Sequence, residues 1–239
     1  MPKLSVVIPS YNEAERIAPT ITYTHEFLKK QGYDFEILVV VDGAKDAAAQ
    51  VVAELQTSVP ELRLINNPQN HGKGYVVRQG MLEAKGEIRL FMDADNSTKV
   101  DHIAEFMPFF DQGFDIVAGS RRIAGADIAV HQGFVRDFLG GVFRFIVHTI
   151  VPLGVTDSQC GFKAFTAEAA ERVFPKQVIN RWAFDVEVLA IARKYGLKIK
   201  EAPIRWVNDG ASTVRFSGMV HMLLEVLEVR WGLWTGKYR

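Results

Sequence analysis

Two carboxylates stand at the end of an apolar run, separated by one small residue. The run 88–92 (IRLFM) stops at Asp93-Ala94-Asp95. Asp is common after a buried strand because its side chain bonds nearby backbone amides, so turn capping alone could account for the pair. Two acids around a sharp bend also offer hard oxygen ligands to Mg²⁺ or Mn²⁺, which bind through one or two carboxylates plus substrate phosphates. We expect Asp93 and Asp95 to hold such a metal and, through it, a diphosphate.

Short apolar runs alternate with helix-like stretches through the first half of the chain. The expected strands are 4–8, 35–41, 62–65, 88–92 and 114–118, and the expected helices are 14–31, 45–58, 73–84 and 100–111. This alternation, with strands apolar throughout, predicts an α/β fold with a mostly parallel, Rossmann-like sheet flanked by helices. Ligands of such sheets bind beyond the carboxyl ends of the strands.

Polar residues follow several of these strands. Asn12 and Asp46 are good helix N-caps and Gly43 suits a turn, so each has a structural explanation beside a functional one. The segment 70–74 (NHGKG) opens the helix at 73–84, and its glycines could let backbone amides approach a phosphate while Lys73 adds a charge. Neither a P-loop spacing nor a G-x-G-x-x-G is present, which weakens ATPase and dinucleotide-binding interpretations.

The bulk composition is that of an ordinary globular enzyme. The 239 residues include 28 basic and 28 acidic side chains, so no overall charge attracts nucleic acid. The single Cys160 cannot form an internal disulfide, and the N-terminus shows no signal-peptide pattern. No apolar run approaches the roughly 18 residues of a transmembrane helix. We expect a cytoplasmic protein that meets a membrane, if at all, from its cytoplasmic face.

Taken in order, several segments resemble the family 2 glycosyltransferases, which have the GT-A fold. The first half carries this resemblance in 9–13 (PSYNE), the acidic turn at Asp42, 70–74 (NHGKG) and 93–95 (DAD). The second half narrows it to the dolichyl-phosphate β-glucosyltransferase branch of polyprenyl-phosphate glycosyltransferases. The segments that do so are 157–163 (DSQCGFK), 182–187 (WAFDVE), 205–206 (RW) and 210–212 (GAS).

The resemblance also implies roles for particular residues. Arg121 and Arg136 would clamp the acceptor phosphate, because a guanidinium fork matches phosphate geometry in two parallel hydrogen bonds. A solvated loop and a surface helix are the alternatives for these two arginines. Together with Asp95 they are the expected catalytic residues. The expected donor-binding residues are Pro9, Tyr11, Glu13, Asp42, Lys73 and Asp93, and the metal ligands are Asp93 and Asp95.

The implied reaction is inverting transfer of a hexose, glucose from UDP-glucose in the first instance, to a dolichyl or polyprenyl phosphate. A hydroxyl acceptor would need a carboxylate base, whereas a phosphate monoester is largely dianionic at pH 7 and needs none. Asp185 and Glu187 begin a helix-like stretch at 186–195, where a structural cap is as reasonable as a base. With a phosphate acceptor they would bind sugar hydroxyls instead, and Gln159 is a similar candidate.

The expected domains are a GT-A catalytic domain over 1–215, with a nucleotide-sugar half (1–120) and an acceptor half (121–215), and a C-terminal amphipathic helix over 216–239. The stretches 134–151 and 217–238 are apolar with basic and aromatic interruptions, which suits a bilayer interface. Burial against the sheet or in an oligomer is the other interpretation of these helices.

Other functions stay open at this point. Transfer of mannose from GDP-mannose, or transfer to a soluble hydroxyl acceptor, would keep the fold and change the specificity. A nucleotide-sugar-binding regulatory protein is the non-enzyme alternative. A sugar-1-phosphate nucleotidyltransferase is disfavoured, because 9–13 (PSYNE) is neither glycine-rich nor basic.

Overall fold

A seven-stranded sheet lies at the centre of the molecule, with the order β3-β2-β1-β4-β7-β5-β8. The computed structural model describes residues 1–128, 134–207 and 216–239. In this sheet β7 runs antiparallel to β4 and β5, and the other neighbours are parallel. The strands are β1 (Leu4–Ser10), β2 (Phe35–Asp42), β3 (Leu62–Asn67), β4 (Ile88–Met92), β5 (Ile116–Ser120), β7 (Phe162–Thr166) and β8 (Ile199–Pro203). The short strands β6 (Asp127–Ile128) and β9 (Arg205–Trp206) form a separate parallel pair.

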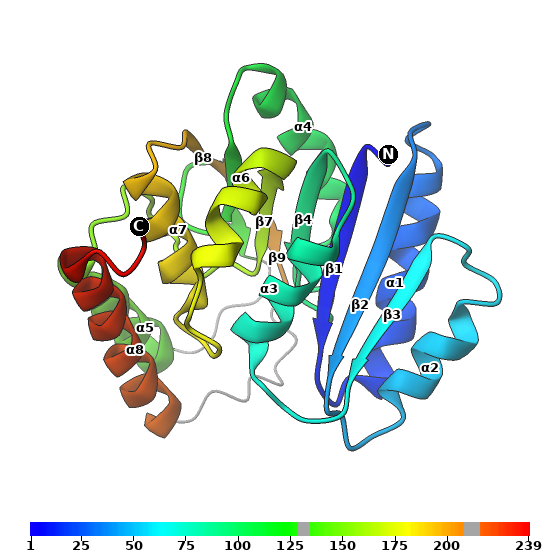
Figure 1. Cartoon of the computed structure of the whole chain (residues 1–239), viewed down its shortest axis with the longest axis horizontal. Helices are drawn as coiled ribbons and strands as arrows, with labels where there is room; N and C mark the ends of the chain where they lie inside the picture. Colours follow the sequence, from blue (N-terminus) through cyan, green and yellow to red (C-terminus); the bar gives the residue numbers. More distant parts are fainter. Residues whose placement is uncertain (129–133, 208–215) are drawn as a thin grey trace.

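Helices cover both faces of the sheet (Figure 1). One face carries α1 (Ala14–Lys29), α2 (Ala48–Leu55), the 3-10 turn Val100–His102 and α4 (Ile103–Asp111). The other carries α3 (Lys73–Glu83), α6 (Ala167–Val173), the 3-10 turn Phe174–Lys176 and α7 (Phe184–Lys194). Successive side chains of β1 enter different cores, Val6 and Ile8 on the first face and Val7 on the second. A strand buried on both faces must be apolar throughout, which explains the continuous run in the sequence.

The predicted α/β class is confirmed, and each of the five expected strands begins and ends within two residues of an observed one. The sequence reading did not anticipate β7, which inserts between β4 and β5, or β8 at the edge. Both strands belong to the range 121–215. The two expected halves of the catalytic domain therefore share one sheet.

Two helices lie together at the end of the sheet opposite β3 (Figure 1): α5 (Phe134–Ile150) and α8 (Phe216–Thr235). They agree closely with the expected stretches 134–151 and 217–238. One side of α8 buries Val226 and Val229, and Tyr238 just beyond it is fully buried. No helix in the described residues is both long and apolar enough to cross a bilayer.

Candidate active site

The carboxyl ends of β1, β2 and β4 share one rim of the sheet, at the lower edge in Figure 1. Hydrogen bonds join the loops that follow β1 and β2. Asn12 Oδ1 accepts from the backbone N–H of Lys45 at 2.8 Å. Asp46 accepts from the N–H groups of Ala14 and Ala48 at 2.8 and 3.0 Å, and so caps both α1 and α2. Asp46 is a helix cap, whereas Asn12 ties two loops together.

Three of the residues expected to bind the donor follow one another at the end of β1. Pro9 is buried within the strand, and Tyr11 is 43% exposed. Glu13 pairs with Arg16, with 2.7 Å between Oε2 and Nε. Burial raises the pKa of the Glu13 carboxyl, although Arg16 opposes the shift. Tyr11 therefore presents an accessible aromatic face at the rim, while Glu13 is already occupied by an ion pair.

Asp42, at the end of β2, anchors the loop that precedes α3. Its carboxylate is buried and accepts hydrogen bonds from the N–H groups of His71 and Gly72 at 2.9 and 2.8 Å. Asn70 also donates to the backbone oxygen of Asp42 at 3.1 Å. Both carboxylate oxygens thus already accept hydrogen bonds from the backbone. The structure gives Asp42 a loop-holding role, and contact with a nucleoside stays a prediction.

Gly72 and Gly74, at the start of α3, serve close packing, which corrects the expectation of a phosphate cradle. A Cβ at Gly72, whose φ is +104°, would lie 2.5 Å from the carbonyl oxygen of Asn180. The N–H groups of Gly74 and Tyr75 donate to the carbonyls of Arg181 and Asn180 at 3.2 and 3.1 Å. Backbone carbonyls therefore cap the N-terminus of α3, and these amides are not available to a phosphate.

The Asp93-Ala94-Asp95 turn lies on the same rim, directly after β4. Asp93 Oδ1 pairs with Lys73 Nζ at 2.5 Å. Burial alone would lower the pKa of the Lys73 ammonium, but nearby carboxylates, Asp93 first, raise it. Asp95 Oδ1 accepts a hydrogen bond from Ser97 N–H at 2.9 Å, and Asn96 between them has φ +55°. The turn is thus held by one oxygen of each acid.

The acids of this turn fit a metal ion that is shared with a substrate. In the described residues, Oδ2 of Asp93 and Oδ2 of Asp95 have no hydrogen-bond or ion-pair partner. The same part of the chain holds no group of three or more His, Cys, Asp or Glu side chains able to hold a metal. Two carboxylates are too few for an all-protein cage, but they suit Mg²⁺ or Mn²⁺ that also binds phosphate oxygens.

Gly161 faces Asp93 across the β4–β7 pair. Met92 and Phe162 are register partners, so the next residues on each strand extension come together. A Cβ on Gly161 would lie 2.1 Å from Asp93 Oδ2. A side chain at position 161 would therefore displace the carboxylate. The antiparallel strand β7 brings this glycine to the site, which reasoning from the sequence did not foresee.

Arg121 is held in place by a buried carboxylate. Its Nε and one Nη donate to the two carboxylate oxygens of Asp157 at 2.7 and 2.9 Å. Burial would raise the pKa of Asp157, but the paired guanidinium lowers it to about 2. The guanidinium also lies 5.5 Å from the ring centre of Trp206. One edge of the fork is thus used internally, which fixes the plane of the group.

Lys163 is a fully buried cation in β7. Its Nζ donates to the carbonyl oxygen of Cys160 at 2.6 Å and to Asp185 Oδ1. Asp185, in the first turn of α7, is also buried and is influenced by the charges of Lys73 and Asp93. Burial raises the pKa of the Asp185 carboxyl, and Lys163 and Lys73 oppose that shift. The expected sugar-binding acid is therefore part of a buried ion pair at the site.

Glu187 is fully buried and is hydrogen-bonded within the protein. It is 0% exposed and accepts hydrogen bonds from the N–H groups of Val178 and Ile179 at 3.0 and 2.8 Å. The hydroxyl of Tyr238 donates to it at 2.8 Å. Burial raises the pKa of the Glu187 carboxyl, and these donors lower it. Glu187 ties the C-terminus to the loop that caps α3, a placement that does not support sugar binding.

The remaining predicted residues are placed less fully. Gln159 is partly buried, and its amide lies 3.3 Å from the sulfur of Met222 in α8. Arg136 belongs to α5, but its side chain lies outside the described residues. The segment 210–212, which contributes to the family resemblance, also lies outside them.

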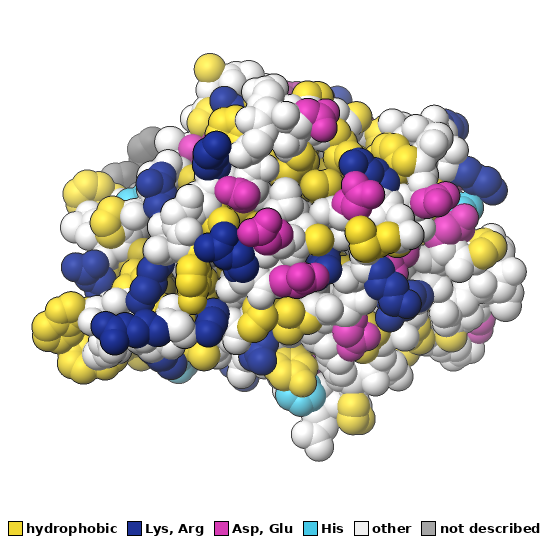
Figure 2. Space-filling view, turned by 45° about the horizontal axis from the view of Figure 1, so that its top comes forward, with side chains coloured by type: hydrophobic (Ala, Val, Ile, Leu, Met, Phe, Trp, Pro, Cys, Tyr) yellow, Lys and Arg dark blue, Asp and Glu magenta, His cyan; other side chains and the backbone are white. Residues whose placement is uncertain are grey.

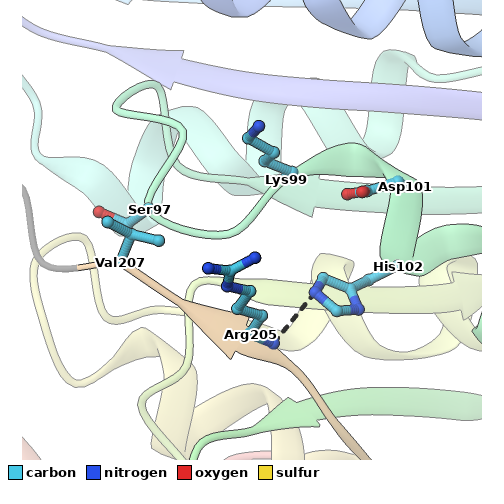
Figure 3. Close-up of a pocket in the computed structure, with 6 residues that line it drawn as sticks. All are labelled: Ser97, Lys99, Asp101, His102, Arg205 and Val207. Carbon is cyan, nitrogen blue, oxygen red and sulfur yellow. Dashed lines mark hydrogen bonds between the residues drawn. The ribbon is translucent and has the colours of Figure 1, made fainter. Parts of the chain in front are cut away.

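A pocket of about 220 Å³ adjoins the acidic turn on the side of Ser97 (Figure 3). Lys99 and Arg205 enter it from different segments of the chain. The backbone N–H of Arg205 donates to His102 Nε2 at 3.0 Å, which orients the imidazole. Lys99 and His102 belong to no motif recognised in the sequence. Arg205 belongs to the 205–206 (RW) segment of the family resemblance, but its place beside the turn was not predicted, because β9 brings it there from more than a hundred residues away.

Comparison with known proteins decides the family. The glycosyl transferase family 2 model matches residues 5–174. The chain belongs to glycosyl transferase family 2. A dolichyl-phosphate beta-glucosyltransferase of Trichomonas vaginalis is 36% identical to it, over 97% of this chain and 73% of the relative. The human dolichyl-phosphate beta-glucosyltransferase is 33% identical, over 99% of this chain and 78% of the relative.

Solved structures agree on the fold of this family 2 glycosyltransferase. Mannosyl-3-phosphoglycerate synthase from Rubrobacter xylanophilus superposes with a TM-score of 0.72 at 18% identity, over 99% of this chain and 75% of the other. Glucosyl-3-phosphoglycerate synthase from Mycobacterium tuberculosis was solved with Mn²⁺, UDP-glucose and phosphoglyceric acid. It superposes with a TM-score of 0.70 at 16% identity, over 97% of this chain and 79% of the other. The predicted GT-A fold is thereby confirmed.

Proposed function

We propose that this glycosyltransferase transfers glucose from UDP-glucose to dolichyl phosphate or a related polyprenyl phosphate, with inversion at the anomeric carbon. The similar dolichyl-phosphate beta-glucosyltransferases support glucose as the sugar and dolichyl phosphate as the acceptor. The observation that carries the acceptor chemistry is the internal engagement of both acids at the start of α7. Asp185 pairs with Lys163, and Glu187 is saturated by backbone and tyrosine donors.

A phosphate acceptor removes the need for a base. A hydroxyl becomes a good nucleophile only as its proton is removed, and both Asp185 and Glu187 are committed elsewhere. A phosphate monoester already carries its negative charge at pH 7. The protein then has only to neutralise, orient and desolvate the acceptor.

Different residues at the rim would bind the metal, the donor diphosphate and the nucleobase. Asp93 and Asp95 would hold Mg²⁺ or Mn²⁺ together with the donor diphosphate. The metal, when bound, supplies positive charge that stabilises the leaving diphosphate. Lys73, paired with Asp93, adds a fixed cation beside it. Tyr11 offers its exposed ring to the nucleobase.

Arg121 is the described candidate for the acceptor phosphate, with Arg136 as its expected partner. Asp157 binds one edge of the Arg121 fork. The second Nη group has no hydrogen-bond partner in the described residues, and the side chain is 24% exposed. An arginine whose plane is already fixed loses little rotamer freedom on binding a phosphate oxygen.

We propose that the enzyme acts at a membrane surface, on the cytoplasmic side. One side of α8 exposes an apolar stripe at spacings of four and three residues: Val220, Leu224, Leu227, Trp231 and Trp234. Phe145 of the neighbouring α5 is 73% exposed. Figure 2 shows hydrophobic and basic side chains together at the end of the molecule that carries these helices. Exposed tryptophans beside cations are typical of helices in a bilayer interface.

The test is transfer of radiolabelled sugar from a panel of UDP- and GDP-sugars to a short polyprenyl phosphate in detergent, with Mg²⁺, Mn²⁺ or EDTA. Metal-dependent labelled lipid from UDP-glucose is the expected result. Labelled lipid from GDP-mannose alone would overturn the assignment of UDP-glucose as the donor. Donor hydrolysis without lipid product would overturn the acceptor, and nucleotide-sugar binding without any turnover would point to a regulatory protein.

A further inference from the structure

The proposed reaction assigns no role to Lys163, a fully buried ionisable group at the site. It lies in the antiparallel strand β7, with Nζ 5.3 Å from the ring centre of Phe91. An ammonium group in such surroundings is costly unless it is paired and fully hydrogen-bonded. Its partners are the carbonyl oxygen of Cys160 and the carboxylate of Asp185. The lysine is therefore fixed by its surroundings, and it fixes Asp185 in turn.

Asp185 would otherwise be placed to act as a base. It lies in the first turn of α7, close enough to Lys73 and Asp93 for their charges to influence its ionisation. Ion pairs join Lys73 of α3 to Asp93 at the end of β4, and Lys163 of β7 to Asp185 of α7, at the donor side of the rim. A buried carboxylate with a raised pKa at the edge of a transfer site has the usual properties of a general base.

We propose that Lys163 determines the acceptor specificity: it holds Asp185 in an ion pair, so that the sugar passes to an acceptor that is already anionic and not to water. This inference rests on the proposed function. Lys163 is thus a positioning residue that acts through Asp185 and does not touch the substrates.

The reaction that Lys163 suppresses is hydrolysis of the donor. In it the oxygen of water bonds to the anomeric carbon while the bond from that carbon to the diphosphate oxygen breaks. A carboxylate accepts the proton that water loses, and the nucleoside diphosphate leaves with the bonding electrons. The products are free sugar and nucleoside diphosphate, so nothing beyond water is consumed.

The experiment compares Lys163→Met with Lys163→Arg. Both substituents are long enough to occupy the site, but only arginine keeps the charge. The quantity measured is the share of consumed UDP-glucose that ends as free glucose, with and without a short polyprenyl phosphate. We expect Lys163→Met to raise this share at least about ten-fold, since a positioned base contributes on the order of 10²–10⁴-fold. Lys163→Arg should stay close to the unsubstituted chain.

Two further readouts separate a specific effect from general damage. Hydrolysis by Lys163→Met should rise with pH through one inflection, and Lys163→Met/Asp185→Asn should lose both the hydrolysis and the inflection. A folded Lys163→Met chain that binds UDP with unchanged affinity and shows an unchanged share of hydrolysis would overturn the proposal.

If Lys163→Met does not fold, the Asp185→Asn variant alone tests the proposal. Its asparagine keeps an oxygen that can accept the hydrogen bond from the Lys163 ammonium. The proposal requires a kcat for lipid transfer that falls less than about ten-fold, whereas loss of a working base would cost on the order of 10²-fold or more. A larger fall at unchanged UDP affinity would overturn it. Failure of the unsubstituted chain to label any lipid would refute the proposed function instead, and the two failures are thus distinct.

Discussion

Two of the chain's acid-x-acid triplets, 93–95 (DAD) and 185–187 (DVE), have opposite properties because their surroundings differ. In the 93–95 triplet (DAD), the side chain of Asp93 is 36% exposed, and each acid uses one oxygen to hold the turn. In the 185–187 triplet (DVE), Asp185 pairs with a buried lysine and Glu187 is 0% exposed. Spacing alone therefore does not identify a metal-binding pair. What separates the two is exposure: the Asp93 side chain is 36% exposed, whereas the Asp185 side chain is 8% exposed and Glu187 is fully buried.

The difference has a structural origin. The 93–95 triplet follows a strand, where the chain leaves the sheet at its rim and side chains reach open space. The 185–187 triplet lies in the first turn of a helix that packs on the sheet, where acids interact favourably with the helix dipole and with nearby amides. One triplet should therefore control activity and the other stability.

The largest effect is expected at Asp95. Asp95→Asn should lower kcat on the order of 10³-fold, because the metal would lose a charged ligand while the Ser97 amide keeps an acceptor. The free energy of unfolding should change little. Steady-state kinetics and Mn²⁺ binding measured by electron paramagnetic resonance test both parts, with the exposed Asp111→Asn as the matched control. Retained activity would mean that the 93–95 triplet is only a turn.

A somewhat smaller effect is expected at Gly161, which sharpens the role of the 93–95 triplet without altering either acid. Gly161→Ala would place a Cβ against the Asp93 carboxylate and move it, which should cost up to about 10²-fold in kcat. Gly141→Ala in α5 is the matched control, since a Cβ there meets Arg144 at an ordinary 3.7 Å. Equal kinetics for the two variants would show that the position of Asp93 is not critical.

The two regions also differ in how well the sequence predicts them. The strands of the first half follow from continuous apolar runs, because β1, β2 and β4 are buried on both faces. Parallel strands then bring the residues after them to one rim, so the association of Asn12, Asp42 and Asp93 could be inferred.

The second half could not be inferred in this way. The strand β7 is short, and its position between β4 and β5 depends on contacts far along the chain. It brings Gly161 against Asp93 and Lys163 against Asp185, and only the three-dimensional structure shows these contacts. The same holds for Glu187, whose partners are loop amides and Tyr238 near the C-terminus. A list of acids in the sequence does not say which of them already have donors.

The next prediction tests the structural triplet. Glu187→Ala leaves two loop amides and the Tyr238 hydroxyl without their acceptor, which should lower the free energy of unfolding by about 3 kcal/mol. Tyr238→Phe removes one of these hydrogen bonds and should cost about 1 kcal/mol. Urea unfolding measures both, with exposed Glu168→Ala as the control. A stable Glu187→Ala chain with lost activity would place Glu187 among the substrate-binding residues.

The free energy of unfolding should fall by about 2 kcal/mol at low pH because of Asp157, at the acceptor side of the rim. The Asp157 pKa is lowered from 3.8 to about 2, a depressed carboxyl pKa. Its stabilisation is therefore present above pH 3.8 and is lost as the pH falls through about 2. With about 1.4 kcal/mol per pKa unit, the loss is roughly 2 kcal/mol. Urea unfolding between pH 5 and 2 should show this decline in the unsubstituted chain, and Asp157→Asn should lack that component.

The smallest effect is expected on α8, the helix that we propose lies in a membrane interface. Glu225 of α8 accepts from the N–H of Ala183 at 2.9 Å, directly before the helix that carries Asp185 and Glu187. Trp231 and Trp234 stand on its exposed side, 61% and 77% accessible. Trp231→Ala/Trp234→Ala should weaken binding to anionic vesicles about ten-fold, since part of each indole leaves water on insertion.

The control for α8 is Leu82→Ala, which removes an exposed apolar side chain from α3. With a short, water-soluble acceptor the tryptophan variant should keep its kcat, because both indoles lie on the exposed side of α8. With acceptor in vesicles its KM should rise. Unchanged vesicle binding in a sedimentation assay would mean that the stripe on α8 meets another protein surface. A fall in kcat with the soluble acceptor would instead show that α8 acts on the rim through Ala183, so that the two triplets do not control activity and stability separately.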